Sequence, residues 1–366
     1  MKYTRMPIEI ESPEQMGYEN VRYNLTESSF QDFQFKNLDL DLNQLVLCYG
    51  DHLGHKKLRG LIASEYNLID DQVMLTVGAA SALFIIATSL LQAQDRLLVL
   101  KPNYATNIET PKAIGAQIDY FDLRIENNFM INMNEFIDAI KSDTKLVSIT
   151  TPHNPTGMMI SETDLQKLAQ VCKAKGIRLL VDETYREMAF DQKTPLAATF
   201  NDQVISVSSV SKSYGLPGIR LGWLITQDKN LMELFLAAKE QIFICGSLLD
   251  EEVAYQFMLK KNQYFREIFP QMKLHLKIVL DWMATENNLT CVKPSGGVVC
   301  FPQMKSYINP ELFYKILNEK YQTFVGPGHW FEQPRSFFRL GFGWPQTEDL
   351  KAGLLAISRA LEEAQI

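Results

Sequence analysis

The sequence lacks two features: a run of apolar residues long enough to cross a membrane, and a cluster of basic residues. Its 366 residues include 36 Lys and Arg against 43 Asp and Glu, which gives a formal net charge of −7. Nucleic acids and anionic lipid surfaces bind clustered lysine and arginine, so the charge argues against both partners. The N-terminal residues lack the apolar core of a signal peptide. We therefore expect a cytoplasmic protein that binds neither nucleic acid nor membrane.

Cysteine and histidine are also scarce. The five cysteines form no Cys-x-x-Cys pair, and we expect them to be buried or half-buried free thiols: Cys48, Cys172, Cys245, Cys291 and Cys300. Two of the five histidines, His52 and His55, are close enough in sequence to suggest metal ligands, but we find no carboxylate or cysteine that completes a set. We predict that the protein binds no metal.

Apolar runs of strand length alternate with helix-like stretches through the first two thirds of the chain. The residues are 46% hydrophobic, which is enough for a large core in about two domains. Near-continuous apolar runs indicate strands buried on both faces, and helical spacing separates them. The expected strands are 96–102, 145–152, 177–183, 203–209 and 220–226, and the expected helices are 78–94 and 161–176. This alternation predicts an α/β fold around a mostly parallel sheet.

The pattern changes near residue 245 to long helical stretches, short paired apolar runs and a final helix expected at 346–364. These features indicate a second, smaller α+β domain. We predict a large domain at 41–265, and a small domain made of 1–40 together with 266–366.

One segment suggests a covalently held phosphate cofactor. Residues 208–223, SSVSKSYGLPGIRLGW, place Lys212 between Ser209 and Arg220. A lysine amine can attack an aldehyde, while a phosphate needs a hydroxyl and a fixed cation nearby. Each fragment alone also occurs on ordinary surface turns, so the segment needs support from the rest of the chain.

Two other segments provide that support. Asn154 lies in TTPHNPTG (150–157), in a turn after an expected strand, where its amide can donate a hydrogen bond to a ligand. In LLVDETY (179–185), Asp182 ends an apolar strand and needs a cationic partner if it is buried. The alternatives are a simple turn for Asn154 and a helix-capping role for Asp182.

Together these segments resemble the class I and II pyridoxal-phosphate (PLP) aminotransferases, over most of the chain and in the family's order. The resemblance implies fold type I, with a mostly parallel sheet and a smaller α+β domain. It also implies PLP bound to Lys212. Asp182 would keep the ring nitrogen protonated, and Asn154 and Tyr185 would donate to the phenolic oxygen. The implied phosphate ligands are Ser209, Ser211, Arg220 and the turn Gly78, Ala79 and Ala80.

Three further positions match the family pattern. Tyr104 matches the aromatic residue that stacks on the cofactor ring, although a surface tyrosine is the alternative. Tyr49 matches a tyrosine that crosses a dimer interface to the neighbouring subunit's phosphate, which implies a homodimer with shared active sites. Arg339, with Asn154, matches the residues that bind the substrate's α-carboxylate; a surface ion pair is the alternative for the arginine.

The N-terminal segment departs from the family pattern. Many relatives have a glycine that binds the substrate carboxylate, but residues 23–30 read YNLTESSF. We hypothesise that Glu27, Ser28 or Ser29 lines the substrate pocket and that Glu27 favours a cationic side chain. A polar surface loop is the alternative.

The expected function is PLP-dependent exchange of an amino group between an amino acid and a 2-oxo acid. The alternative keeps the cofactor but makes the protein a lyase, decarboxylase or cyclase acting on an amino acid. A third possibility, a non-enzymatic effector domain of a regulator, is disfavoured because Lys212, Asp182 and Arg339 are all present.

Overall fold

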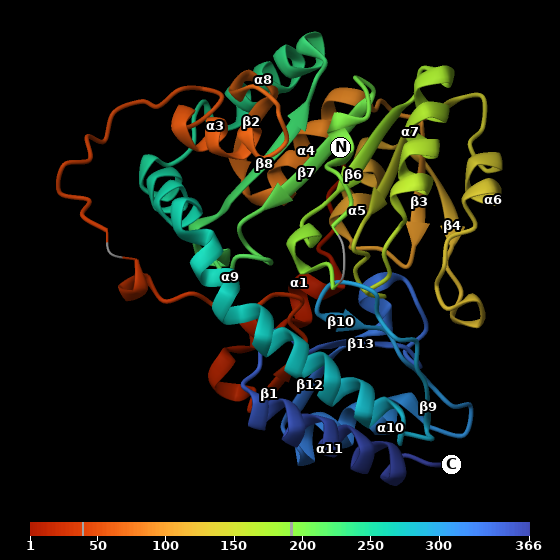
Figure 1. Ribbon diagram of the computed structural model, residues 1–366. Helices are drawn as coiled ribbons and strands as arrows, with labels where there is room; N and C mark the ends of the chain where they lie inside the picture. Colours follow the sequence, from red (N-terminus) through yellow and green to blue (C-terminus); the bar gives the residue numbers. More distant parts are fainter. Residues whose placement is uncertain (39, 191–192) are drawn as a thin grey trace.

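A seven-stranded sheet forms the centre of the larger part of the molecule (Figure 1). The computed structural model describes residues 1–38, 40–190 and 193–366. The strands follow the order β2-β8-β7-β6-β5-β3-β4, and only β8 runs antiparallel to its neighbours. Their bounds are β2 (Val73–Val77), β3 (Arg96–Lys101), β4 (Gln117–Asp122), β5 (Thr144–Thr150), β6 (Arg178–Asp182), β7 (Val204–Ser209) and β8 (Leu221–Thr226). The predicted mostly parallel α/β sheet is confirmed.

Helices cover both faces of this sheet, which explains why its strands are apolar on both sides. In β3, Leu97 and Val99 pack into a cluster with α4 and α8, while Leu98 and Leu100 pack into another with α6 and α7. Alternate residues of a strand point to opposite faces, so each strand contributes to two cores. The helices of this part are α3 (Lys56–Ser64), α4 (Gly78–Leu90), α5 (Thr106–Ile114), α6 (Met133–Asp138), α7 (Glu162–Lys175) and α8 (Lys229–Phe243).

Helix α7 begins and ends where its local sequence predicts. The Ser161 hydroxyl accepts a hydrogen bond from the Asp164 backbone N–H at 3.1 Å, which satisfies one free donor of the first turn. Gly176 follows the last helical residue with a φ of 66°, a left-handed conformation that glycine adopts easily.

A smaller four-stranded sheet, ordered β1-β12-β13-β10, lies beyond the first one (Figure 1). Its first strand comes from the N-terminal segment and pairs in parallel with β12. The strands of this part are β1 (Tyr23–Leu25), β9 (Leu289–Thr290), β10 (Val299–Cys300), β11 (Gln303–Met304), β12 (Thr323–Pro327) and β13 (Phe338–Gly341). Its helices are α1 (Pro7–Glu11), α2 (Pro13–Met16), α10 (Pro310–Lys315) and α11 (Thr347–Glu363).

One long helix, α9 (Leu248–Met283), runs from the large sheet to the small one (Figure 1). The domain boundary predicted at 265/266 falls inside this helix, so the two parts share it. The division into domains stays a prediction. None of the helices within the described ranges combines the length and apolar character that crossing a membrane requires.

The prediction of buried or half-buried cysteines is wrong for Cys48, which is exposed. Cys48 belongs to an extended segment, residues 40–50, that projects from the body of the molecule (Figure 1), so little of the chain covers it. Just after this segment in the sequence, His52 Nδ1 lies 2.6 Å from Glu240 Oε1, and His55 Nε2 lies 3.3 Å from Glu252 Oε2.

Candidate active site

A cavity of about 740 Å³ lies where the carboxyl ends of β5, β6 and β7 meet the N-terminal segment and β13. Ligands of open α/β sheets bind at this edge. Eleven residues predicted from the sequence line the cavity: Ala79, Ala80, Tyr104, Asn154, Asp182, Tyr185, Ser209, Ser211, Lys212, Arg220 and Arg339. Glu27, Ser28 and Ser29 line it as well, so they do not form a polar surface loop.

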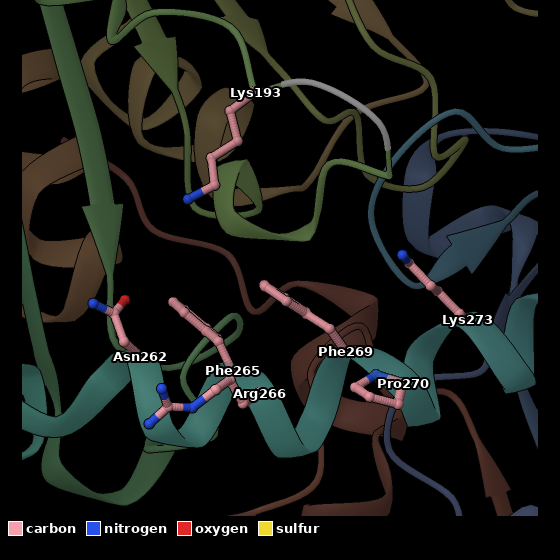
Figure 2. A pocket seen from close by; sticks show the side chains of 7 residues that line it. All are labelled: Lys193, Asn262, Phe265, Arg266, Phe269, Pro270 and Lys273. Atoms are coloured by element: carbon pink, nitrogen blue, oxygen red, sulfur yellow. The ribbon is translucent and has the colours of Figure 1, made fainter.

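A second hollow, of about 550 Å³, lies along α9 and contains none of the predicted residues. Figure 2 shows Phe265 and Phe269 projecting from α9 into this hollow, with Lys193 on the opposite side. Its lining has basic side chains but no carboxylate, whereas the first cavity is lined by side chains of both charges.

Lys212 lies in the loop between β7 and β8. The loop is fixed to the N-terminal segment, because the Phe30 backbone N–H donates to the Lys212 carbonyl at 3.1 Å. At the end of β7, the Ser209 hydroxyl accepts from the Ser211 backbone N–H at 3.3 Å. The side chain of Lys212 is half-buried and faces the cavity as one of its lining groups.

An anion-binding cradle is formed by the start of α4 and Arg220. Gly78 begins the helix with a φ of 69°, and a Cβ there would lie 2.8 Å from Arg220 Nη2. No side chain caps the first turn, so its backbone N–H groups are free to bind an anion. Gly222 of β8 packs against the same turn: a Cβ on it would lie 2.5 Å from the Gly78 carbonyl carbon. A phosphate fits this cradle.

Asp182 ends β6 as a buried carboxylate, only 5% exposed. Its Oδ1 accepts from the Thr184 backbone N–H at 3.0 Å and from the Thr184 hydroxyl at 2.6 Å. Burial raises the pKa of Asp182, and the hydrogen bonds from Thr184 oppose that rise. No lysine, arginine or histidine of the described residues pairs with it, so its charge requires a cation from outside. A protonated pyridine nitrogen fits this requirement.

Asn154 and Tyr185 meet in the cavity. Asn154 Nδ2 donates to the Tyr185 hydroxyl at 3.2 Å, and this hydroxyl also lies 3.0 Å from Ser28 Oγ. Burial raises the pKa of Tyr185 to about 12, so the phenol keeps its proton and can donate a hydrogen bond. The turn that holds Asn154 is supported by His153, whose Nδ1 lies 2.8 Å from Thr156 Oγ1.

Arg339 enters the cavity from β13 and is 5% exposed, so it is not part of a surface ion pair. Its Nη1 donates to Asn154 Oδ1 at 3.0 Å, and its Nη2 donates to the Thr26 carbonyl at 2.6 Å. Nε is buried without a partner. Burial lowers the pKa of Arg339, but the guanidinium stays charged at neutral pH. This unpaired cation is suited to a carboxylate ligand.

The N-terminal segment contributes lining residues that the sequence did not predict. Glu9, Ser12, Glu14, Tyr18 and Asp32 all line the cavity, and so does Trp344 after β13. Tyr104 donates from its hydroxyl to Glu9 Oε1 at 3.3 Å. No local pattern distinguishes these residues from surface positions. Tyr49, by contrast, lies outside the cavity and is 82% exposed.

Comparison with known proteins finds a matching family and several similar proteins. The family model described as aminotransferase class I and II matches residues 22–357. Capreomycidine synthase from Streptomyces vinaceus is 29% identical over 325 residues, covering 88% of this chain and 82% of that protein. A PLP-dependent aminotransferase from Streptococcus suis superposes with a TM-score of 0.92 over the whole of both chains at 24% identity. The PLP-dependent cyclase OrfR is 25% identical, with a TM-score of 0.88 over 99% of this chain and 98% of that one.

The cradle geometry predicts that Gly222→Ala weakens PLP binding. The added Cβ would lie 2.6 Å from the Ala79 backbone nitrogen, so the first turn of α4 must shift. Overpacking of this kind typically costs about 1–3 kcal/mol, and we expect the dissociation constant of PLP to rise between about fivefold and about 150-fold. The matched control is Gly218→Ala, where nothing lies within 4 Å of the added atom. Equal PLP affinity in the two variants would contradict the proposed cradle.

Proposed function

Since this chain belongs to the class I and II aminotransferases, a PLP-dependent family, we propose a role in amino transfer for each group that lines the cavity. The proposal depends most on Asp182, a buried carboxylate without a cation of its own, in a cavity that also contains Lys212 and Arg339. This set is suited to a ligand with a cationic ring nitrogen and to a substrate with a carboxylate. An amino acid and a 2-oxo acid are the substrates that the family implies.

We assign the cofactor contacts as follows. The Lys212 amine binds the cofactor covalently, because it is the only lysine among the lining residues. The phosphate is held by Arg220, by the free N–H groups at the start of α4 and by two hydroxyls, those of Ser209 and Ser211. Tyr104 stacks on the ring.

The chemistry that PLP supplies when bound is an electrophilic carbon for amines and a ring that withdraws electrons. Asp182 keeps the ring nitrogen protonated, which strengthens that withdrawal. Asn154 and Tyr185 donate to the phenolic oxygen, and the short distance between the two side chains supports this shared role.

The substrate is oriented by Arg339, which binds the α-carboxylate together with Asn154. The hydrogen bond between these two side chains supports the pairing, and the unpartnered Arg339 Nε provides a further donor. As a free amine, Lys212 would act as the base that takes a proton from the substrate α-carbon.

A second outcome, cyclisation of an amino acid, is favoured by two similarities. The Streptomyces vinaceus relative is named a synthase of capreomycidine, and OrfR is a PLP-dependent cyclase. Both reactions would use the same groups around the cofactor, so the difference depends on the substrate and the N-terminal wall of the cavity. Product analysis distinguishes the two outcomes.

We also propose a cytoplasmic homodimer in which Tyr49 completes the neighbouring subunit's phosphate site. The segment 40–50 projects from the body of the molecule, and its side chains Val46, Leu47 and Tyr49 are 72%, 72% and 82% exposed. Large apolar side chains at this exposure favour burial against another chain.

Replacement of the lysine tests the catalytic assignment. Lys212→Ala should lose the visible absorbance of covalently bound PLP and all conversion of the bound aldehyde to the amine form. The exposed Lys260→Ala should keep both. In the unmodified protein, each converted cofactor should release one 2-oxo acid. Covalent PLP that survives in Lys212→Ala would disprove the lysine assignment, and a cyclic product with the aldehyde form retained would favour the cyclase.

Replacement of Tyr49 tests the shared site. Loss of a hydrogen bond to a charged group costs about 1.5–3 kcal/mol, so Tyr49→Phe should raise the dissociation constant of PLP about tenfold or more. Tyr3→Phe, another exposed tyrosine, is the control and should leave it unchanged. Sedimentation should give a dimer for all forms. If Tyr49→Phe were a monomer and still bound PLP as tightly as the unmodified protein, a shared site would be refuted.

A further inference from the structure

Four carboxylates line the active-site cavity without a role in binding the cofactor: Glu9, Glu14, Glu27 and Asp32. All come from the first 32 residues of the chain, whereas the groups assigned to the cofactor come from the large sheet with its loops and helices, and Arg339 comes from β13. The cavity therefore has a cationic part around Lys212 and Arg339, and an acidic part formed by the N-terminal segment.

Three of these carboxylates affect the pKa of the same hydroxyl, that of Tyr18. Burial and then the charges of Glu27, Glu14 and Asp32 raise the pKa of Tyr18 above its usual range. Glu27 also raises the pKa of Asp32, whose largest shift comes from burial and is opposed by the hydrogen bond from Trp344 and the charge of Lys212. Tyr18 and these three carboxylates line the same cavity.

An aromatic pair completes this acidic wall. The rings of Tyr18 and Trp344 are stacked with centroids 6.3 Å apart and planes 14° apart. Trp344 Nε1 donates to Asp32 Oδ2 at 3.0 Å, which fixes the carboxylate beside the rings. Carboxylates next to aromatic faces form a suitable environment for an organic cation.

Within residues 1–38, 40–190 and 193–366, none of the four carboxylates forms an ion pair with a lysine, arginine or histidine. Glu11 on the same segment is different, because its Oε2 lies 2.7 Å from His329 Nε2. Among the four carboxylates, the charge of Glu27 raises the pKa of Asp32, and a cation bound beside these two would relieve that repulsion.

Arg339, which we propose binds the substrate carboxylate, contacts the segment that forms the acidic wall. Its buried Nε has no partner, and its Nη2 is bound to the carbonyl of Thr26, the residue before Glu27. The charges of Glu27 and Glu14 oppose the lowering of its pKa by burial, so both act on the guanidinium. A ligand whose carboxylate binds Arg339 therefore extends beside the acidic wall.

We propose that the amino-acid substrate carries a positively charged side chain, an ammonium or a guanidinium group, bound by Glu27, Asp32 and Glu14 against Tyr18 and Trp344. This inference rests on the proposed amino-transfer function. It assigns substrate selection to the N-terminal segment.

The test compares cationic amino acids with neutral analogues on the PLP-loaded protein. Arginine is paired with citrulline, which has nearly the same shape without the charge, and lysine is paired with norleucine, which lacks the ε-ammonium group. Binding is followed by calorimetry, and conversion of the bound aldehyde to the amine form is followed by absorbance. We expect each cationic member to bind about tenfold more tightly than its neutral partner, since a hydrogen bond to a charged group is worth at least this much. Conversion should show the same preference.

The variants identify the source of this preference. Glu27→Gln with Asp32→Asn should abolish it for both pairs while norleucine binding stays within about twofold. Glu19→Gln, an exposed change on the same segment outside the cavity lining, is the control and should keep it.

Each outcome distinguishes this inference from the proposed reaction. Equal binding of the charged and neutral partners, or a preference that survives the double variant, would overturn the inference while leaving amino transfer intact. A charge preference in binding without any conversion would support the inference and count against amino transfer. A preference for arginine alone would assign the site to guanidinium, and a preference for lysine alone to ammonium.

Discussion

The site depends on the buried carboxylate of Asp182, which has no cationic partner among the described residues of the chain. This carboxylate lies at the end of β6, and among the residues that the structure describes only Thr184 donates hydrogen bonds to it. A buried anion in this position is costly without a cation, so the fold is suited to a ligand that brings one. In the proposed function, the lysine of the β7–β8 loop and the cradle at the start of α4 would hold the rest of that ligand. The parallel sheet makes this possible, because it brings the ends of β5, β6 and β7 to one edge.

The N-terminal segment is the second determinant of the site. It joins the small sheet through β1 and reaches the large part through the hydrogen bond between the Phe30 N–H and the Lys212 carbonyl. The carbonyl of Thr26 also fixes Arg339. The N-terminal segment therefore holds Arg339 in position, and it also supplies the acidic wall of the cavity. Under the proposed function, the cofactor chemistry and the choice of substrate would thus depend on different parts of the chain.

The sequence predicted what is encoded locally. Apolar runs identified β3, β5, β6, β7 and β8, and Ser161 with Gly176 marked the ends of α7. Motifs predicted eleven lining residues through family resemblance. The pairing of β1 with β12 was not predictable, since its partners are about 300 residues apart and each strand is short. For the same reason, the approach of Tyr18 to Trp344 was not predicted. The exposure of Cys48 was missed because composition does not show which segment projects from the fold.

The central claim is that Asp182 receives its missing cation from the cofactor ring. The most direct measurement is the ¹⁵N chemical shift of the ring nitrogen in PLP labelled at that atom and bound to the protein, followed from pH 6 to about 9. We predict a protonated nitrogen throughout this range, and deprotonation at neutral pH in Asp182→Asn, with the exposed Asp202→Asn behaving like the unmodified protein. An unprotonated nitrogen at neutral pH in the unmodified protein would contradict the account.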